Sequence, residues 1–211
     1  KLLIDNNKEF KIKDLISYST SIHKDQGFSF SNNSSQKELS DFLMDRLKYY
    51  MKEKKIRAEI IDASIKAHGI DHLNKIYKKA STLNGLINKE IGGDIITSYK
   101  RAASILDVEL KNAGLELSNI TDSGIFKNDY EKNLFKKINE IRKYFTNIGK
   151  DENYKETLVI LAGAKKVTSE FFDNVKVNDD DKNIKKNRLE LLQMLCRTFD
   201  NYINFSNIEI K

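Results

Sequence analysis

Few residues of this sequence have the types and spacing that enzyme chemistry requires. His68 and His72 lie four residues apart, a spacing that can place two imidazoles on one helix face as metal ligands. Gly69 interrupts that helix and no glutamate follows the first histidine, so we interpret both as surface histidines. Cys196 lies beside an apolar stripe, which favours a buried thiol over a nucleophile. The SxxK pattern at residues 34–37 has no companion motif, and the sequence predicts no catalytic residue and no metal site.

Two arginines occupy positions where a charge is costly. Arg46 and Arg188 each lie four residues after one apolar side chain and four before another, so each falls inside the apolar stripe of its helix. A buried guanidinium must be paired, and we predict structural ion pairs across helices with carboxylates such as Asp62 or Asp173. The alternative is that the stripe faces a groove in which the arginine reaches a phosphate.

Other basic residues lie among aromatic residues on positions predicted to face solvent. Cations position phosphates and aromatic rings stack on unpaired bases, so this combination is the one that single-stranded RNA requires. For any single lysine the alternative is a solvated helix face without a ligand. The candidate RNA-binding residues are Tyr49, Lys100, Arg101, Lys182, Lys185, Lys186 and Asn187.

Composition limits the class of protein that carries these residues. The chain has 211 residues, 39% of them hydrophobic and 32% charged, with no proline and nine glycines, which favours helices over a many-turned β fold. A net charge of +6 and a pI near 9.1 are compatible with a polyanionic partner. The single cysteine excludes an internal disulfide and fits a reducing cytoplasm. No signal peptide or membrane span is predicted, and the start at Lys1 leads us to expect a piece of a longer protein.

Apolar periodicity predicts an all-α fold, a helical bundle. A polar loop at residues 25–36 is the most plausible boundary. We therefore expect a helical lead-in and loop from a preceding domain at residues 1–34, and one α-helical domain at residues 35–211. Ser35 and Glu38 form a capping-box pattern at the start of that domain. The predicted helices cover residues 10–23, 37–54, 57–68, 72–87, 92–106, 129–149, 154–175 and 181–205.

Several segments, in chain order, resemble a known family. They are "DFLMDRLKYYMKEKKIRAEIIDASI", "SYKRAASIL", "YEKNLFKKI" and "FFDNVKVNDDDKNIKKNRLELLQMLCRTF". Together they are similar to the C-terminal region of the bacterial glycyl-tRNA synthetase beta subunit, over roughly residues 39–205. The positions that match the family's motifs are Asp45, Arg46, Lys100, Arg101, Phe171, Phe172, Asp173, Val175, Asn187 and Arg188.

The resemblance implies a DALR-type anticodon-binding domain that binds tRNA-Gly and performs no chemistry itself. In that family a separate alpha subunit activates glycine with ATP and Mg²⁺, within a cytoplasmic heterotetramer of two alpha and two beta chains. The resemblance implies no cofactor for this part of the enzyme. The alternatives are the similar domain of arginyl-tRNA synthetase and a non-enzymatic helical adaptor whose lysines are incidental. An HD-type hydrolase is disfavoured, because the chain has only three histidines.

The resemblance also suggests which of residues 171–192 are structural and which face solvent. The aromatic residues, Asp173 and Arg188 would pack and pair at a helix–loop–helix corner, while Lys185, Lys186 and Asn187 would face the solvent side available to RNA. We predict that Lys185 and Lys186 gather with Lys100 and Arg101 on one exterior flank. Lys55 stands where the family usually has glycine, which implies a differently closed turn.

Overall fold

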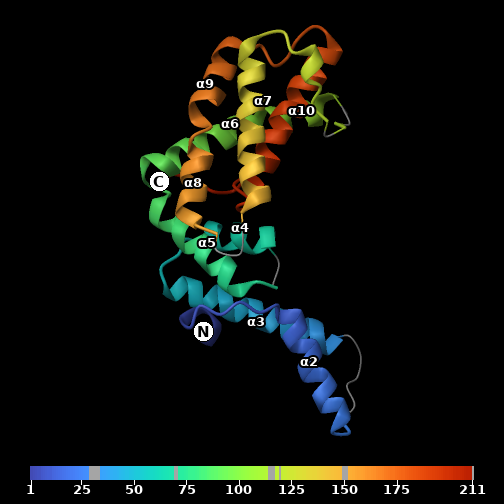
Figure 1. Ribbon diagram of the computed structural model, residues 1–211, viewed down its shortest axis with the longest axis vertical. Helices are drawn as coiled ribbons and strands as arrows, with labels where there is room; N and C mark the ends of the chain where they lie inside the picture. Colours follow the sequence, from blue (N-terminus) through green and yellow to red (C-terminus); the bar gives the residue numbers. More distant parts are fainter. Residues whose placement is uncertain (29–33, 69–70, 114–116, 119, 149–151, 211) are drawn as a thin grey trace. The chain divides into compact units, whose positions relative to one another are not determined.

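The computed structural model describes residues 1–28, 34–68, 71–113, 117–118, 120–148 and 152–210, and Figure 1 shows the course of the chain. Regular structure in these residues is helical throughout, without a β-strand, which confirms the predicted all-α class. None of their helices is long and apolar enough to cross a membrane. The chain divides into two compact units, Lys1–Asn84 and Gly85–Lys211, and each has its own buried apolar side chains.

The predicted domain boundary near residue 34 stays a prediction. Residues 29–33 of the predicted loop lie outside the described residues. The third helix begins at Ser34, one residue before the predicted cap Ser35, whose side chain is also outside the described part. The division between the two compact units falls later in the chain, after Asn84.

The first unit is helical in the residues that the structure describes. Its buried residues include Leu47 and Met51 on the third helix, Ile60 on the fourth and Ile76 on the fifth. The elements are α1 (Leu2–Asp5), α2 (Ile12–Asp25), α3 (Ser34–Glu53), α4 (Ala58–His68) and α5 (Leu73–Leu86), the last of which continues past the unit boundary.

The turn between α3 and α4 contains a lysine in the left-handed backbone region. Lys55 has a φ of 59°, a conformation that glycine adopts far more readily than other residues. The N–H of Lys55 donates to the carbonyl of Lys52 (2.9 Å) and the N–H of Ile56 to that of Met51 (3.1 Å), the Schellman pattern of a helix end. The helix α3 therefore ends in a left-handed turn of the kind that glycine favours, with a lysine at the left-handed position.

The second unit is a bundle in which ten residues of α10 are buried. α6 packs against α8, α9 and α10, and α7 packs against α9 and α10 (Figure 1). Leu189, Leu192, Leu195 and Phe199 of α10 are all buried, because they recur at helical spacing. The elements are α6 (Glu90–Ala113), the 3₁₀ turn η1 (Ser123–Ile125), α7 (Asp129–Asn147), α8 (Tyr154–Ala162), α9 (Lys165–Asn174) and α10 (Lys182–Asp200).

The prediction of one helix over residues 154–175 is wrong, because α8 ends at Ala162 and α9 begins at Lys165. The N–H of Gly163 still donates to the carbonyl of Val159 (3.0 Å), after which the chain turns. Glycine is among the poorest helix formers, so ending the helix at this position costs little free energy. The break allows α8 to pack against α6 while α9 packs against α7.

A buried tyrosine fixes which side of α6 faces the core. The ring of Tyr99 lies 5.7 Å from the ring of Phe205, and its hydroxyl donates to the carboxylate of Asp200 (3.1 Å). Burial and the nearby Asp200 carboxylate raise the pKa of Tyr99 well above its ordinary value. Because Tyr99 points inward, the next two residues, Lys100 and Arg101, are directed toward the outside of the bundle.

Candidate nucleic-acid interface

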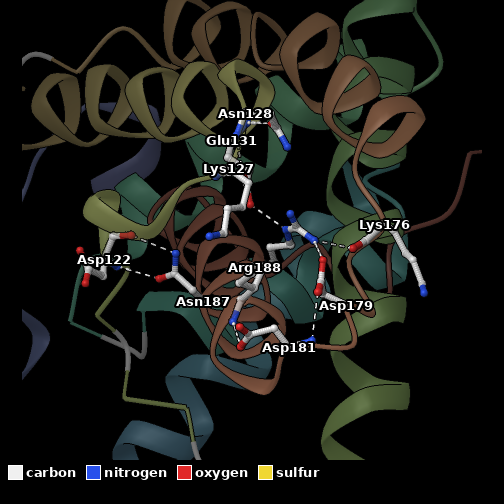
Figure 2. Close-up of polar contacts among 10 residues, drawn as sticks. Asp122, Lys127, Asn128, Glu131, Lys176, Asp179, Asp181, Asn187 and Arg188 are labelled. Atoms are coloured by element: carbon white, nitrogen blue, oxygen red, sulfur yellow. Dashed lines mark hydrogen bonds and ion pairs between the residues drawn. The ribbon is translucent and has the colours of Figure 1, made fainter.

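A buried arginine holds the corner between α9 and α10. Arg188 is 5% exposed, and its Nε donates to Oε1 of Glu131 (2.7 Å). Its Nη1 donates to Oδ2 of Asp179 (2.6 Å) and to the carbonyl of Lys176 (2.8 Å). Figure 2 shows these partners converging on the guanidinium from α7 and from the α9–α10 connection. Arg188 thus makes structural ion pairs, with Glu131 and Asp179 in place of the predicted Asp173.

Glu131 serves the start of α7 as well as Arg188. The residue is 1% exposed, and its Oε2 accepts from the backbone N–H groups of Lys127 (2.7 Å) and Asn128 (3.1 Å). The side chain of Asn128 accepts in return from the N–H of Glu131 (3.0 Å), which completes a capping box. One carboxylate therefore fixes the first turn of α7 to α10 (Figure 2).

Two aspartates order the connection between α9 and α10. Asp179 accepts from the N–H of Asp181 (3.0 Å) and from Arg188, and both interactions hold the pKa of Asp179 below its ordinary value. Asp181 caps α10, since its Oδ1 accepts from the N–H groups of Asn183 (2.8 Å) and Ile184 (3.3 Å). These two acidic residues before the lysines are thus part of the structure of the corner.

Asn187 lies inside the unit, not on the solvent side as predicted. It is 4% exposed, its Oδ1 accepts from the N–H of Asp122 (2.7 Å) and its Nδ2 donates to the carbonyl of the same residue (2.9 Å). One turn on, Glu190 accepts from the N–H and the hydroxyl of Ser118. The buried polar side of α10 therefore supplies the hydrogen bonds that the connector between α6 and α7 cannot make within itself.

In the first unit, the arginine predicted to be buried lies in solvent. Arg46 is exposed on α3, with its guanidinium carbon 5.2 Å from the centre of the Phe42 ring. Within the described residues it forms no ion pair, and Asp62 is an exposed residue of α4. Tyr49 is 60% exposed whereas Leu47 is buried, so the stripe through Arg46 is the outer side of α3.

The outer side of α6 carries two of the candidate cations. The guanidinium carbon of Arg101 lies 4.4 Å from the centre of the Phe172 ring, and its Nη1 lies 3.5 Å from Oδ1 of Asp173. The Arg101 side chain is 49% exposed and also lines a groove on this side of α6. Lys100 is half-buried, and its Nζ lies 3.8 Å from Oε1 of Glu209.

A shallow groove of about 680 Å³ lies beside these two cations. It is lined by hydroxyl, cationic and apolar side chains and by the carboxylate of Glu209, a mixture of polar and apolar groups that suits a base with its ribose. We call its polar wall the α6 flank, which consists of Thr97, Lys100, Arg101 and Ser104.

The surroundings of the lysines at the start of α10 differ from one lysine to the next. Nζ of Lys185 lies 2.7 Å from Oε2 of Glu109 on α6, and the two side chains are only 19% and 16% exposed. This pair connects α6 to α10, about 12 Å along α6 from Arg101. Lys182 is exposed and Lys186 half-buried, and neither forms an ion pair with another described residue.

The residues first considered for chemistry form no site in the described part of the chain. Cys196 is buried as predicted, and burial raises the pKa of its thiol to about 12. His72 is half-buried, while the side chains of His68 and Ser34 lie outside the described residues. No group of three or more His, Cys, Asp or Glu residues that could hold a metal occurs among the residues described.

Sequence reasoning missed the glutamates that organise this unit. Glu131 follows Asn128 by three residues, so the capping-box pattern could have indicated it. Glu190 and Glu109 carry no such signal, because each looks like an ordinary charge on a solvated helix face. The partner of Glu190, Ser118, is 72 residues away in the sequence.

The DALR anticodon binding domain family matches residues 95–210, and the chain belongs to this family. The matched residues run from α6 through α10 and include both the α6 flank and the Arg188 corner.

Curated relatives extend the similarity to the first unit. The glycine–tRNA ligase beta subunit of Rickettsia prowazekii is 30% identical over 208 residues, which are 99% of this chain and 29% of that protein. The beta subunits of Rickettsia africae (28%) and Rickettsia felis (29%) also match 99% of this chain and 29% of their own length. These matches confirm the resemblance predicted from the sequence segments, and the chain spans less than a third of the length of these relatives.

Proposed function

We propose that this chain is the anticodon-binding part of a glycine–tRNA ligase beta chain, that it binds tRNA-Gly, and that it carries out no chemistry itself. The observation that carries the proposal is the family match over residues 95–210, together with beta-subunit relatives that cover 99% of the chain. Activation of glycine with ATP and Mg²⁺ then belongs to a separate alpha subunit, in a cytoplasmic heterotetramer of two alpha and two beta chains.

The α6 flank supplies a chemical basis for reading an unpaired base. Arg101 is held against Phe172 on one face and is restrained at its edge by Asp173. A guanidinium fixed in this way presents its other face as a platform on which a base can stack. The groove beside it leaves room for the base, and the hydroxyls of Thr97 and Ser104 can hydrogen-bond to its edge.

The remaining candidate residues divide into two roles. Lys100, Lys182 and Lys186 would contact phosphates, which position an RNA without reading its sequence. Lys185 and Asn187 would stabilise the fold of the unit and would not contact RNA directly, because their polar atoms are bound to Glu109 and Asp122. In the first unit Tyr49 offers an exposed ring for a further stacking contact.

A binding experiment tests the proposal. Affinity is measured for tRNA-Gly and for the same tRNA with a swapped anticodon, each at two salt concentrations. We expect preference for the glycine anticodon and an affinity that falls as salt rises, because phosphate contacts release counterions.

Three results would contradict the proposal, each in its own way. Equal affinity for the two tRNAs would exclude anticodon reading. Preference for an arginine anticodon would favour the arginyl-tRNA synthetase alternative. No binding, or binding that is insensitive to salt, would favour the helical adaptor.

A further inference from the structure

A second polar hollow lies between α7 and α10 and shares no residue with the groove beside α6. Its volume is about 240 Å³. Pockets for drug-sized molecules have volumes of about 300–1,000 Å³, so this hollow suits a single chemical group of a larger ligand. We call it the α7–α10 pocket, and it is lined by Arg142, Gln193, Met194, Arg197, Thr198 and Asn201.

Two unneutralised guanidinium groups give the α7–α10 pocket its charge. Arg142 of α7 and Arg197 of α10 are both exposed, and no carboxylate lines the hollow. Within the described residues neither guanidinium forms an ion pair, whereas Arg101 and Arg188 of the same unit each have a carboxylate partner. The planar fork of an arginine matches a phosphate group, and an anion between two arginines relieves their repulsion.

Gln193, which lines the pocket, also has an acceptor without a donor among the described residues. Oε1 of Gln193 is buried and accepts no hydrogen bond from the described residues. A buried acceptor left in this state is destabilising, and a ligand that brings a donor would satisfy it. The 2′-hydroxyl of a ribose is such a donor, and it lies next to a phosphate in an RNA chain.

The position of the pocket on α10 relates it to the lysines at the start of that helix. Lys182, Lys186, Gln193 and Arg197 are separated by four, seven and four residues, which places them on one side of a continuous helix. Lys186 and Arg197 are about 16 Å apart along the axis. One side of α10 therefore offers cations over a span of several nucleotides.

We infer that the α7–α10 pocket binds a ribose phosphate of the tRNA backbone, outside the anticodon bases. This inference rests on the proposed function, and it adds a contact that is independent of sequence. Arg142 and Arg197 hold the phosphate oxygens, and Gln193 accepts a hydrogen bond from the 2′-hydroxyl.

The inference is tested by the affinity of the whole chain for tRNA-Gly and for anticodon-swapped tRNA-Gly across a range of salt. Arg142→Gln and Arg197→Gln should each weaken binding several-fold for both tRNAs. Each should reduce the slope of log affinity against log salt, and the two substitutions combined should reduce it by about 0.7–0.9, the contribution of one phosphate contact. Gln193→Leu should weaken binding several-fold without changing the slope, because it removes an acceptor and no charge. The control is Lys143→Gln, which removes a charge from the next residue of α7 and does not line the pocket.

The outcomes separate this inference from the proposed function. If the wild-type chain prefers tRNA-Gly and both arginine variants behave like Lys143→Gln, the inference is wrong and the proposed function stands. If the arginine variants lose anticodon preference instead of overall affinity, the pocket reads bases and the inference is again wrong. If the wild-type chain binds neither tRNA, the proposed function fails and this inference fails with it. Thermal unfolding of each variant checks that the fold is retained.

Discussion

Nε of Arg188 lies 2.7 Å from Oε1 of Glu131, and this contact fixes α10 to the first turn of α7. Both side chains are almost fully buried, with exposed fractions of 6% and 1%. Removing Glu131 would leave the buried Arg188 guanidinium with the partly exposed Asp179 as its carboxylate partner among the described residues. The stability of the second unit should therefore depend on this pair.

Glu131→Gln should lower the free energy of unfolding by up to about 3–5 kcal/mol, the cost of an uncompensated buried charge, because Asp179 still compensates part of the charge of Arg188. Glutamine can still complete the capping box at the start of α7, so the substitution acts chiefly on the ion pair. Urea denaturation followed by circular dichroism measures the change. Asp173→Asn is the control, because its pair with Arg101 is exposed and should contribute less than about 1 kcal/mol. Equal effects of the two substitutions would contradict the importance of the buried pair.

Asp179→Asn should change how the stability of the fold depends on pH in the acidic range. The pKa of Asp179 is lowered in the folded chain, so its ionised form stabilises the fold at every pH above its ordinary pKa. That contribution is lost as the pH falls through the lowered folded pKa. The variant should therefore be less stable at pH 7 and should lose less stability than the wild type below about pH 5. Parallel losses of stability for the two proteins, measured by denaturation at several pH values, would contradict this.

Cys196 should react with thiol reagents only when the chain unfolds. Its thiol is buried, and its pKa of about 12 leaves almost no thiolate at pH 8. Labelling by an aromatic disulfide reagent should be slow in buffer and complete within minutes in concentrated urea. Rapid labelling of the folded chain would show that α10 opens locally around this residue.

Lys55→Gly should stabilise the first unit. A side chain in the left-handed region is disfavoured by about 1–2 kcal/mol, and the greater freedom of glycine in the unfolded chain offsets about 0.4–1 kcal/mol of this. We expect a net gain of about 0.5–1 kcal/mol in thermal or urea unfolding. Lys54→Gly, at the preceding position without a positive φ, is the matched control and should give no gain. A gain for both variants would show that the effect does not come from the turn.

The existence of the helices could be predicted from the sequence, because apolar periodicity records which residues share a face. The side of a helix that is buried could not always be predicted. On α10 the stripe through Arg188 is buried, whereas on α3 the stripe through Arg46 is exposed, although the two patterns look alike in the sequence. The difference depends on which neighbouring elements cover each helix, and this is a property of the tertiary structure.

The polar contacts of the candidate interface could likewise not be predicted from the sequence. Arg101 and Phe172 are far apart in the sequence, and their stacking could not be predicted from local patterns. Asn187 looks like a surface residue beside two lysines, yet its amide is bound to the backbone of a connector 65 residues earlier. Long-range hydrogen bonds of this kind leave no periodic signal. Arg142 and Arg197 likewise became a candidate site only when α7 and α10 brought them together.

The most direct test of the account is the anticodon preference of Arg101→Lys. Lysine keeps the positive charge but cannot stack as a plane between Phe172 and a base. Affinities for tRNA-Gly and for anticodon-swapped tRNA-Gly are measured at two salt concentrations, for the variant and for the wild type. We predict an unchanged salt dependence and a loss of about tenfold in the preference for the glycine anticodon. One base stack contributes about 1–3 kcal/mol, and without it the base is no longer held where the hydroxyls of Thr97 and Ser104 can read its edge. A variant that keeps the full wild-type preference would contradict the role assigned to the α6 flank.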